Sequence, residues 1–143
     1  MKALLKFFRL EFLPLSADVA LLVLRAWLGL TILLNHGLDK LLTFSEMAAG
    51  FPDPLGVGHQ VSLALAVFGE VVCAVLLTLG LFGRFAALGL AITMAVAFFM
   101  VHQGALTGEN SGELAFVYLA GFVTLLIAGP GRFALDTAMG GRK

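Results

Sequence analysis

Residues 59–82 read HQVSLALAVFGEVVCAVLLTLGLF, and this stretch decides the fold class. A helix needs roughly 20 consecutive, mostly apolar residues to cross the hydrocarbon core of a bilayer. The stretch meets that requirement and holds one carboxyl group, that of Glu70, near its middle. It therefore predicts a membrane-spanning helix that carries an acidic side chain into the apolar layer.

Three further stretches have a similar length and composition, at about 19–42, 85–102 and 113–128. Of the whole chain 60% is hydrophobic and 13% is charged, and the mean hydropathy is +1.02. A soluble domain could not bury so much apolar surface. The sequence therefore predicts an all-α integral membrane protein in which residues 16–131 form a four-helix bundle, packed through the small residues of the spans.

The segments outside the spans have their own patterns. Residues 2–13 place basic side chains on one helix face and leucines and phenylalanines on the other, which predicts an amphipathic interfacial helix within residues 1–15. Pro14 ends it, and Ser16 is a plausible N-cap for the first span. Residues 43–58 are rich in proline and glycine and predict a loop, and residues 132–143 form a short basic tail.

The basic residues predict the orientation of the chain in the membrane. Short loops rich in lysine and arginine tend to remain in the cytoplasm. Lys40 lies alone on the side opposite to both termini. The sequence thus predicts that the N- and C-termini are cytoplasmic. The basic residues on the side of the termini are Lys2, Lys6, Arg9, Arg84, Arg132, Arg142 and Lys143.

Glu70 is the strongest indication of chemistry in the sequence. An ionised carboxylate in the middle of a span is costly and needs a partner or a proton. At 1.5 Å per residue, Arg25 lies roughly 9 Å from the cytoplasmic edge and Glu70 roughly 18 Å, so a direct pair requires the arginine to reach toward the bilayer centre. Two interpretations stay open: an ion pair that only fixes helix register, and a carboxylate that handles protons or binds a substrate.

A second polar group is predicted near the outer face. His36 follows Arg25 by about three helical turns on the same face. His36, Asp39, His102 and Glu113 reach similar depths, where a histidine can exchange a proton at neutral pH. The plainer alternative is that these histidines only meet water and headgroups. No metal site is predicted, because the side chains come from three segments and lack the usual spacing of histidine ligands.

Several classes of chemistry are not indicated. Cys73 is the one cysteine of the chain, so a disulfide or thiol relay within it is excluded, and an apolar setting keeps a thiol protonated and inert. The sequence has no haem, flavin or iron–sulfur signature, so electrons would have to come from a partner. A net charge of zero without a basic patch gives no sign of a nucleic-acid partner.

Three stretches together carry a family pattern. They read LRAWLGLTILLNHGLDKL at 24–41, EVVCAVLLTLGLFGR at 70–84 and GELAFVYLAGFVTLLIAGPGRFALD at 112–136. In order and spacing they resemble the DoxX family of small bacterial membrane proteins. The resemblance implies a four-helix bundle in the bacterial cytoplasmic (inner) membrane. It marks as positions of interest Arg25, His36, Lys40, Glu70, Glu113, Arg132 and Asp136.

The resemblance also suggests a redox role. Named relatives include a membrane subunit of a thiosulfate:quinone oxidoreductase and a member of a membrane-associated oxidoreductase complex linked to thiol and oxidative-stress defence. The leading hypothesis is a redox-associated membrane subunit that offers a polar pocket to a quinone or a small sulfur-containing substrate. Its catalytic residues would be Glu70 and His36, and its substrate-binding residues Arg25, Asp39, Lys40, His102 and Glu113.

Two alternatives compete with this hypothesis. The first is a non-enzymatic subunit that docks a larger membrane complex through the small-residue faces of its helices, in which Arg25 and Glu70 only lock the bundle. The second is a passage for a small solute or proton, which four helices would form as a homo-oligomer.

Overall fold

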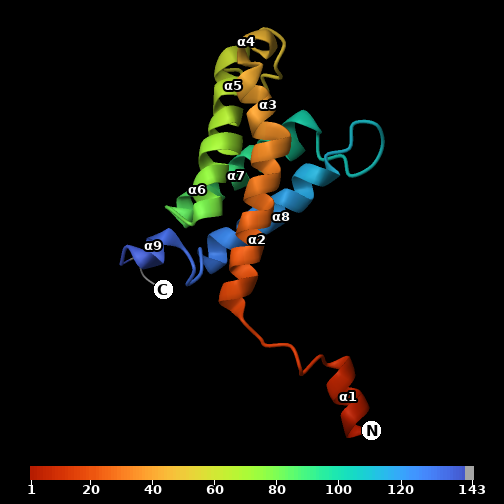
Figure 1. The fold of residues 1–143 in the computed structure, drawn as a ribbon. Helices are drawn as coiled ribbons and strands as arrows, with labels where there is room; N and C mark the ends of the chain where they lie inside the picture. Colours follow the sequence, from red (N-terminus) through yellow and green to blue (C-terminus); the bar gives the residue numbers. More distant parts are fainter. Residues whose placement is uncertain (141–143) are drawn as a thin grey trace.

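The protein is all-helical over residues 1–140, which are the residues that the computed structural model describes (Figure 1). Three helices are long and apolar enough to cross a bilayer, at Ala17–Leu42, His59–Leu79 and Gly83–Val101. The predictions of an all-α chain and of apolar membrane-spanning helices are confirmed at this level. Arg142 and Lys143 of the predicted basic tail lie outside the described residues.

Each of the three long helices contains a π-helical segment. The first consists of α2 (Ala17–Ile32), η1 (Leu33–Gly37) and α3 (Leu38–Leu42). The second consists of α5 (His59–Val67), η2 (Phe68–Cys73) and α6 (Ala74–Leu79). The third consists of α7 (Gly83–Ala95) and η3 (Val96–Val101).

The fourth apolar helix, α8 (Glu113–Ala128), has 16 residues and packs along α7. At 1.5 Å per residue it is about 24 Å long, shorter than the roughly 30 Å of a hydrocarbon core. Residues from all four helical segments form one core. Its buried members include Ile32, Cys73, Leu77, Leu90, Met94, Phe122 and Leu125.

Glycines bring these helices close together. A Cβ atom at Gly29 would overlap the hydroxyl of Thr78, and one at Gly69 would overlap that of Thr93. Gly29 thereby joins α2 to α6, and Gly69 joins η2 to α7. The small residues of the spans are therefore used to pack the helices of this chain against one another.

The connecting segments differ in detail from the sequence-based expectations. The N-terminal helix α1 (Lys2–Phe8) is shorter than the predicted 2–13, because Leu10 has a positive φ of 52° that a helix cannot accommodate. The predicted loop 43–58 contains a short helix, α4 (Phe44–Met47). The first long helix begins as expected at Ser16, whose hydroxyl accepts a hydrogen bond from the Val19 N–H at 3.2 Å.

Two ends of the molecule can be distinguished in Figure 1. We call the end that holds residues 43–58 the loop end. We call the opposite end of the packed helices, where the short helix α9 (Leu135–Ala138) lies, the α9 end; α1 lies beyond it.

Candidate binding site

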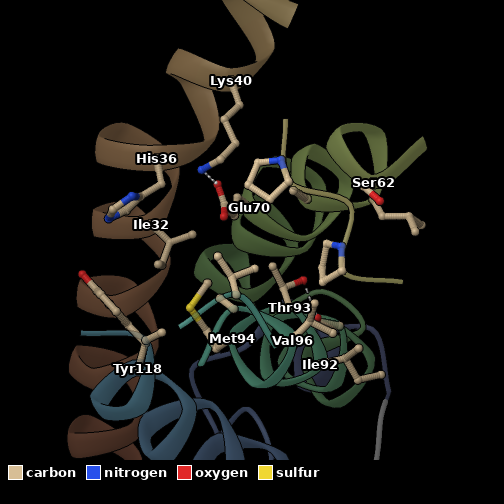
Figure 2. Close-up of a pocket in the computed structure, with 18 of the residues that line it drawn as sticks. Ile32, His36, Lys40, Ser62, Glu70, Ile92, Thr93, Met94, Val96 and Tyr118 are labelled. Carbon is tan, nitrogen blue, oxygen red and sulfur yellow. Dashed lines mark hydrogen bonds and ion pairs between the residues drawn. The ribbon is translucent and has the colours of Figure 1, made fainter. Parts of the chain in front are cut away.

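A cavity of about 690 Å³ lies among the four helical segments toward the loop end (Figure 2). Its walls come from α2 and α3, from α5 and η2, from α7 and η3, and from the first turns of α8. Most of the lining is aliphatic or aromatic, with a few polar side chains among them. A volume of this size with a mainly apolar wall and few polar groups is typical of small-molecule sites.

The charged part of the cavity wall is an ion pair between Lys40 and Glu70. Lys40 Nζ donates a hydrogen bond to Glu70 Oε2 at 2.6 Å (Figure 2). The Glu70 side chain is 9% exposed and the Lys40 side chain 17% exposed. Each of these shielded charges depends on the other, because removing one partner of a buried ion pair typically lowers the free energy of unfolding by about 3–5 kcal/mol.

Glu70 is thus paired with Lys40 and not with Arg25. Lys40 lies near the end of the first long helix, but its four-carbon stem lets the ammonium group reach back along the helix. Arg25 lies toward the α9 end, where Nη2 donates to the carbonyl oxygen of Phe133. It does not line the cavity, so the structure does not bring Arg25 to the predicted pocket.

Arg25 instead belongs to a group of contacts that we call the α9-end cluster, made of Asp18, Arg25, Gly80, Phe133 and Asp136. Gly80 has φ +71°, and a Cβ atom there would overlap the guanidinium of Arg25. The Asp136 carboxylate accepts hydrogen bonds from the first N–H groups of the α7 turn at 2.7 and 2.8 Å. Asp18 Oδ1 accepts from a backbone N–H, 2.9 Å away, in the segment after α8. These contacts indicate that Arg25 helps to hold the chain segments of the α9 end together and does not bind a substrate.

Three of the polar residues of the cavity lie in or directly after the π-helical segments. His36 lies in η1, Glu70 lies in η2, and His102 directly follows η3. A π-helical turn inserts one extra residue into an α-helix, which redirects the side chains that follow and is often found at functional sites. Sequence reasoning assumed regular α-helices and missed this feature.

The pair depends on a close crossing of η1 and η2. Gly37 packs directly on the backbone of Glu70, where a Cβ atom would overlap the Glu70 carbonyl oxygen and crowd Val71. Because Gly37 allows this approach, Lys40 in the next turn comes within reach of the Glu70 side chain. The glycine that follows His36 thus determines where the ion pair forms.

The two predicted histidines both line the cavity, but from different walls. His36 is half-buried on the α2–α3 side, and its imidazole extends away from Lys40 and Glu70 (Figure 2). His102 is half-buried on the η3 side, and its Nδ1 lies 3.2 Å from the carbonyl oxygen of Asn110. Both imidazoles could therefore meet a molecule in the cavity.

The two carboxylates predicted to join them do not line it. Asp39 and Glu113 are both exposed and lie outside the lining. Within residues 1–140, no group of three or more histidine, cysteine, aspartate or glutamate side chains is placed to hold a metal ion. The cavity therefore brings together His36, Lys40, Glu70 and His102, and leaves out Arg25, Asp39 and Glu113.

Sequence reasoning missed four polar residues of the lining, which are Ser62, Thr93, Ser111 and Tyr118. Tyr118 is 8% exposed and stacks on Phe122, with ring centroids 6.0 Å apart. It is the one tyrosine of the chain, and its place inside an apolar span was a usable signal, because a buried tyrosine usually has a polar partner. Thr93 gave no such signal, since its hydroxyl bonds within its own helix to the carbonyl of Gly89.

The loop end of the cavity is covered by residues 51–55, which we call the roof. The roof lines the cavity with Phe51, Pro52, Pro54 and Leu55. Asp53 fastens it to α5: Oδ1 accepts from the Ser62 hydroxyl at 2.7 Å and Oδ2 from the Gly58 N–H at 2.8 Å. His59 adds a hydrogen bond between Nδ1 and the carbonyl oxygen of Phe51, 2.6 Å apart.

These contacts lower the pKa of Asp53. The hydrogen bond from Ser62 contributes most, and the N–H groups of Gly58 and Val57 and the nearby His59 add to it. A carboxylate with a depressed pKa stabilises the folded state above its ordinary pKa, and this contribution is lost as the pH falls through the depressed value. The roof should therefore stay fastened at neutral pH and loosen only in acid.

We expect Asp53→Ala to loosen the roof at neutral pH. The substitution removes the acceptor for Ser62 and for two backbone N–H groups, so the Gly58 amide should exchange with solvent on the order of tenfold faster. Hydrogen exchange read by mass spectrometry would measure this. Glu46→Ala, at an exposed carboxylate of the same connection, should leave the exchange unchanged. Equal exchange in both variants would show that Asp53 does not hold the roof.

Comparison with known proteins identifies the family of the chain. The DoxX family model matches residues 20–103, from α2 to the end of η3. The chain belongs to the DoxX family. The match contains the ion pair, both cavity histidines and the roof, while α8 lies beyond it.

Two relatives of this DoxX chain come from Haemophilus influenzae, and each carries the name "Uncharacterized protein". One is 30% identical over 129 residues, which are 86% of this chain and 85% of the relative. The other is 37% identical over 106 residues, or 71% of this chain and 77% of the relative. No solved structure matches.

Proposed function

We propose that this DoxX protein is a membrane subunit associated with oxidoreduction, whose cavity binds a quinone or a small sulfur-containing compound. The observation that carries the proposal is the buried Lys40–Glu70 pair in the wall of a large, mainly apolar cavity. A charged pair that served helix register alone would not need to face a cavity. Here it offers a proton acceptor and a cation to whatever enters.

The chemistry follows from the groups in the cavity. Reduction of a quinone takes two electrons and two protons. A partner protein with its own redox group would supply the electrons, since the chain has no signature for one. Glu70 and His36 would pass the protons to the quinone oxygens, Lys40 would stabilise an anionic oxygen, and His102 would hydrogen-bond a carbonyl on the opposite side.

The proposal includes a topology of four crossings in the bacterial cytoplasmic membrane. α8 would form the fourth crossing despite its length, because it packs along α7. Both termini would be cytoplasmic, with α1 as an amphipathic helix on the membrane surface. The pairing of Lys40 with Glu70 supports this orientation, because the one lysine of the opposite side is neutralised.

The packing of the glycines argues against the alternative that the protein is a non-enzymatic docking subunit. Docking through small-residue faces needs such faces to be available to a partner. Gly29 and Gly69 are occupied by contacts within the chain, and Gly121 packs against Leu28. The cavity is therefore the better supported site, and a protein partner would have to dock elsewhere on the surface.

We expect Glu70→Gln to weaken quinone binding by about tenfold or more, because the cavity loses a charged hydrogen-bond acceptor and its ion pair. The measurement is titration of the purified protein in nanodiscs with a short-chain benzoquinone. Glu113→Gln is a matched control at an exposed glutamate outside the lining and should bind as the wild type does. Wild-type affinity in Glu70→Gln, or no binding by the wild type, would refute the proposal.

A further inference from the structure

The cavity is closed by apolar residues toward the loop end. The roof presents Phe51, Pro52, Pro54 and Leu55 to the space, and hydrogen bonds of Asp53 and His59 fasten it to α5. A polar solute that came from water on this side would have to pass an apolar, fastened cover and lose its hydration there. The roof therefore does not resemble the mouth of a site for small hydrophilic molecules.

The side between α5 and α7 has a different character. Five large apolar residues line the cavity there and are at the same time between 43 and 56% exposed. We call them the side rim: Leu65, Phe68, Phe85, Leu88 and Ile92. They belong to two of the helices that are long and apolar enough to cross a membrane, so their exposed surface faces acyl chains in a bilayer. The cavity thus borders lipid along this rim.

The ion pair and Tyr118 lie away from the rim. Glu70 and Tyr118 are both buried, and the ion pair lies at the wall formed by α3 and η2. Figure 2 shows Lys40, Glu70 and His36 grouped on one side of the cavity and Ile92 on the other. The cavity therefore has a polar interior and an apolar edge, which suits a molecule with a polar head and an apolar tail.

We infer that the ligand reaches the cavity sideways from the lipid, between α5 and α7, and that it is a tail-bearing amphiphile dissolved in the membrane. Its polar ring lies against the Lys40–Glu70 pair, and its tail leaves across the side rim. This inference rests on the proposed function and narrows it, because it selects a lipophilic quinone-like molecule over a small water-soluble sulfur compound.

The test compares two benzoquinones with the same ring, one with a decyl tail and one without a tail. In Ile92→Trp the indole narrows the rim, so the affinity for the decyl compound should fall about tenfold while that for the tail-less compound stays within about twofold. Ile127→Trp is the matched control, at an exposed isoleucine of α8 that does not line the cavity. It should bind both compounds as the wild type does and so corrects for partition of the tail into lipid.

A second variant changes the side rim on α5. Leu65→Trp narrows the side rim from that helix and should also lower the affinity for the decyl compound alone, so the test remains valid if Ile92→Trp does not fold. Equal effects on both compounds, or no effect in either tryptophan variant, would overturn the lateral route. If the tail-less compound still responds to Glu70→Gln in that case, the cavity proposal stands without it. If the wild type binds neither compound, both proposals fail.

Discussion

Replacing Lys40 by methionine is expected to lower the free energy of unfolding by about 3–5 kcal/mol, because it leaves the Glu70 carboxylate buried without its cation. The two side chains are 2.6 Å apart and largely shielded from solvent, so the carboxylate has little hydration to replace the ammonium group. Thermal and denaturant unfolding in detergent micelles, together with the amount of folded protein in membranes, would measure the loss.

A double variant separates stability from binding. Lys40→Met combined with Glu70→Met removes both charges and keeps side chains of similar length, so most of the lost stability should return. Quinone binding should not return, because the cavity would then have neither the proton acceptor nor the cation. A single Lys40→Met variant as stable as the wild type would contradict the ion pair. A double variant that binds quinone normally would contradict its role in the cavity.

The second large effect is expected from Gly37→Ala. The added methyl group would overlap the carbonyl oxygen of Glu70, a backbone atom that can move only if η1 and η2 separate. Overpacking of this kind typically costs 1–3 kcal/mol, so we expect a loss of about 2–3 kcal/mol in spite of the better helix propensity of alanine. Separation of the two segments should also pull Lys40 from Glu70 and weaken quinone binding.

Gly50→Ala is the control for this substitution. A Cβ atom at Gly50 meets nothing within 4 Å, and the stability of this variant should therefore stay within about 0.5 kcal/mol of the wild type. Denaturant unfolding of both variants in the same micelles gives the comparison. If Gly37→Ala were as stable as Gly50→Ala, the close crossing of η1 and η2 would be wrong.

Much of the fold could be predicted from hydropathy, because a bilayer imposes a minimum length on an apolar helix. The stretches expected at 19–42, 59–82 and 85–102 correspond to helices at Ala17–Leu42, His59–Leu79 and Gly83–Val101. The need of Glu70 for a partner was equally predictable, since an isolated charge in the apolar layer is too costly. Both predictions depend only on the composition and length of an apolar segment, and these can be read from a single sequence.

The identity of that partner could not be predicted in the same way. Backbone rise along a regular helix was the measure that made Arg25 the candidate partner, and Lys40 was counted for the orientation of the chain and as a substrate-binding residue, not as that partner. Lys40 is the partner in the structure, because its side chain is long and because η1 and η2 cross closely at Gly37. Asp39 and Glu113 lie outside the cavity lining for a related reason, because depth along a helix does not fix the face on which a residue lies. For Asp39, the π-helical segment η1 directly before it also shifts that face.

The α9-end cluster has a consequence for the order in which the molecule is completed. Arg25 and its acceptor, the carbonyl of Phe133, are 108 residues apart in the chain, and Asp18 contacts a backbone N–H 114 residues away. During synthesis the arginine therefore enters the membrane long before its acceptor exists, and water or lipid headgroups must solvate its charge in the meantime. The contacts of the α9-end cluster therefore form late in biogenesis, because they need the last part of the nascent polypeptide to pack against the first helix.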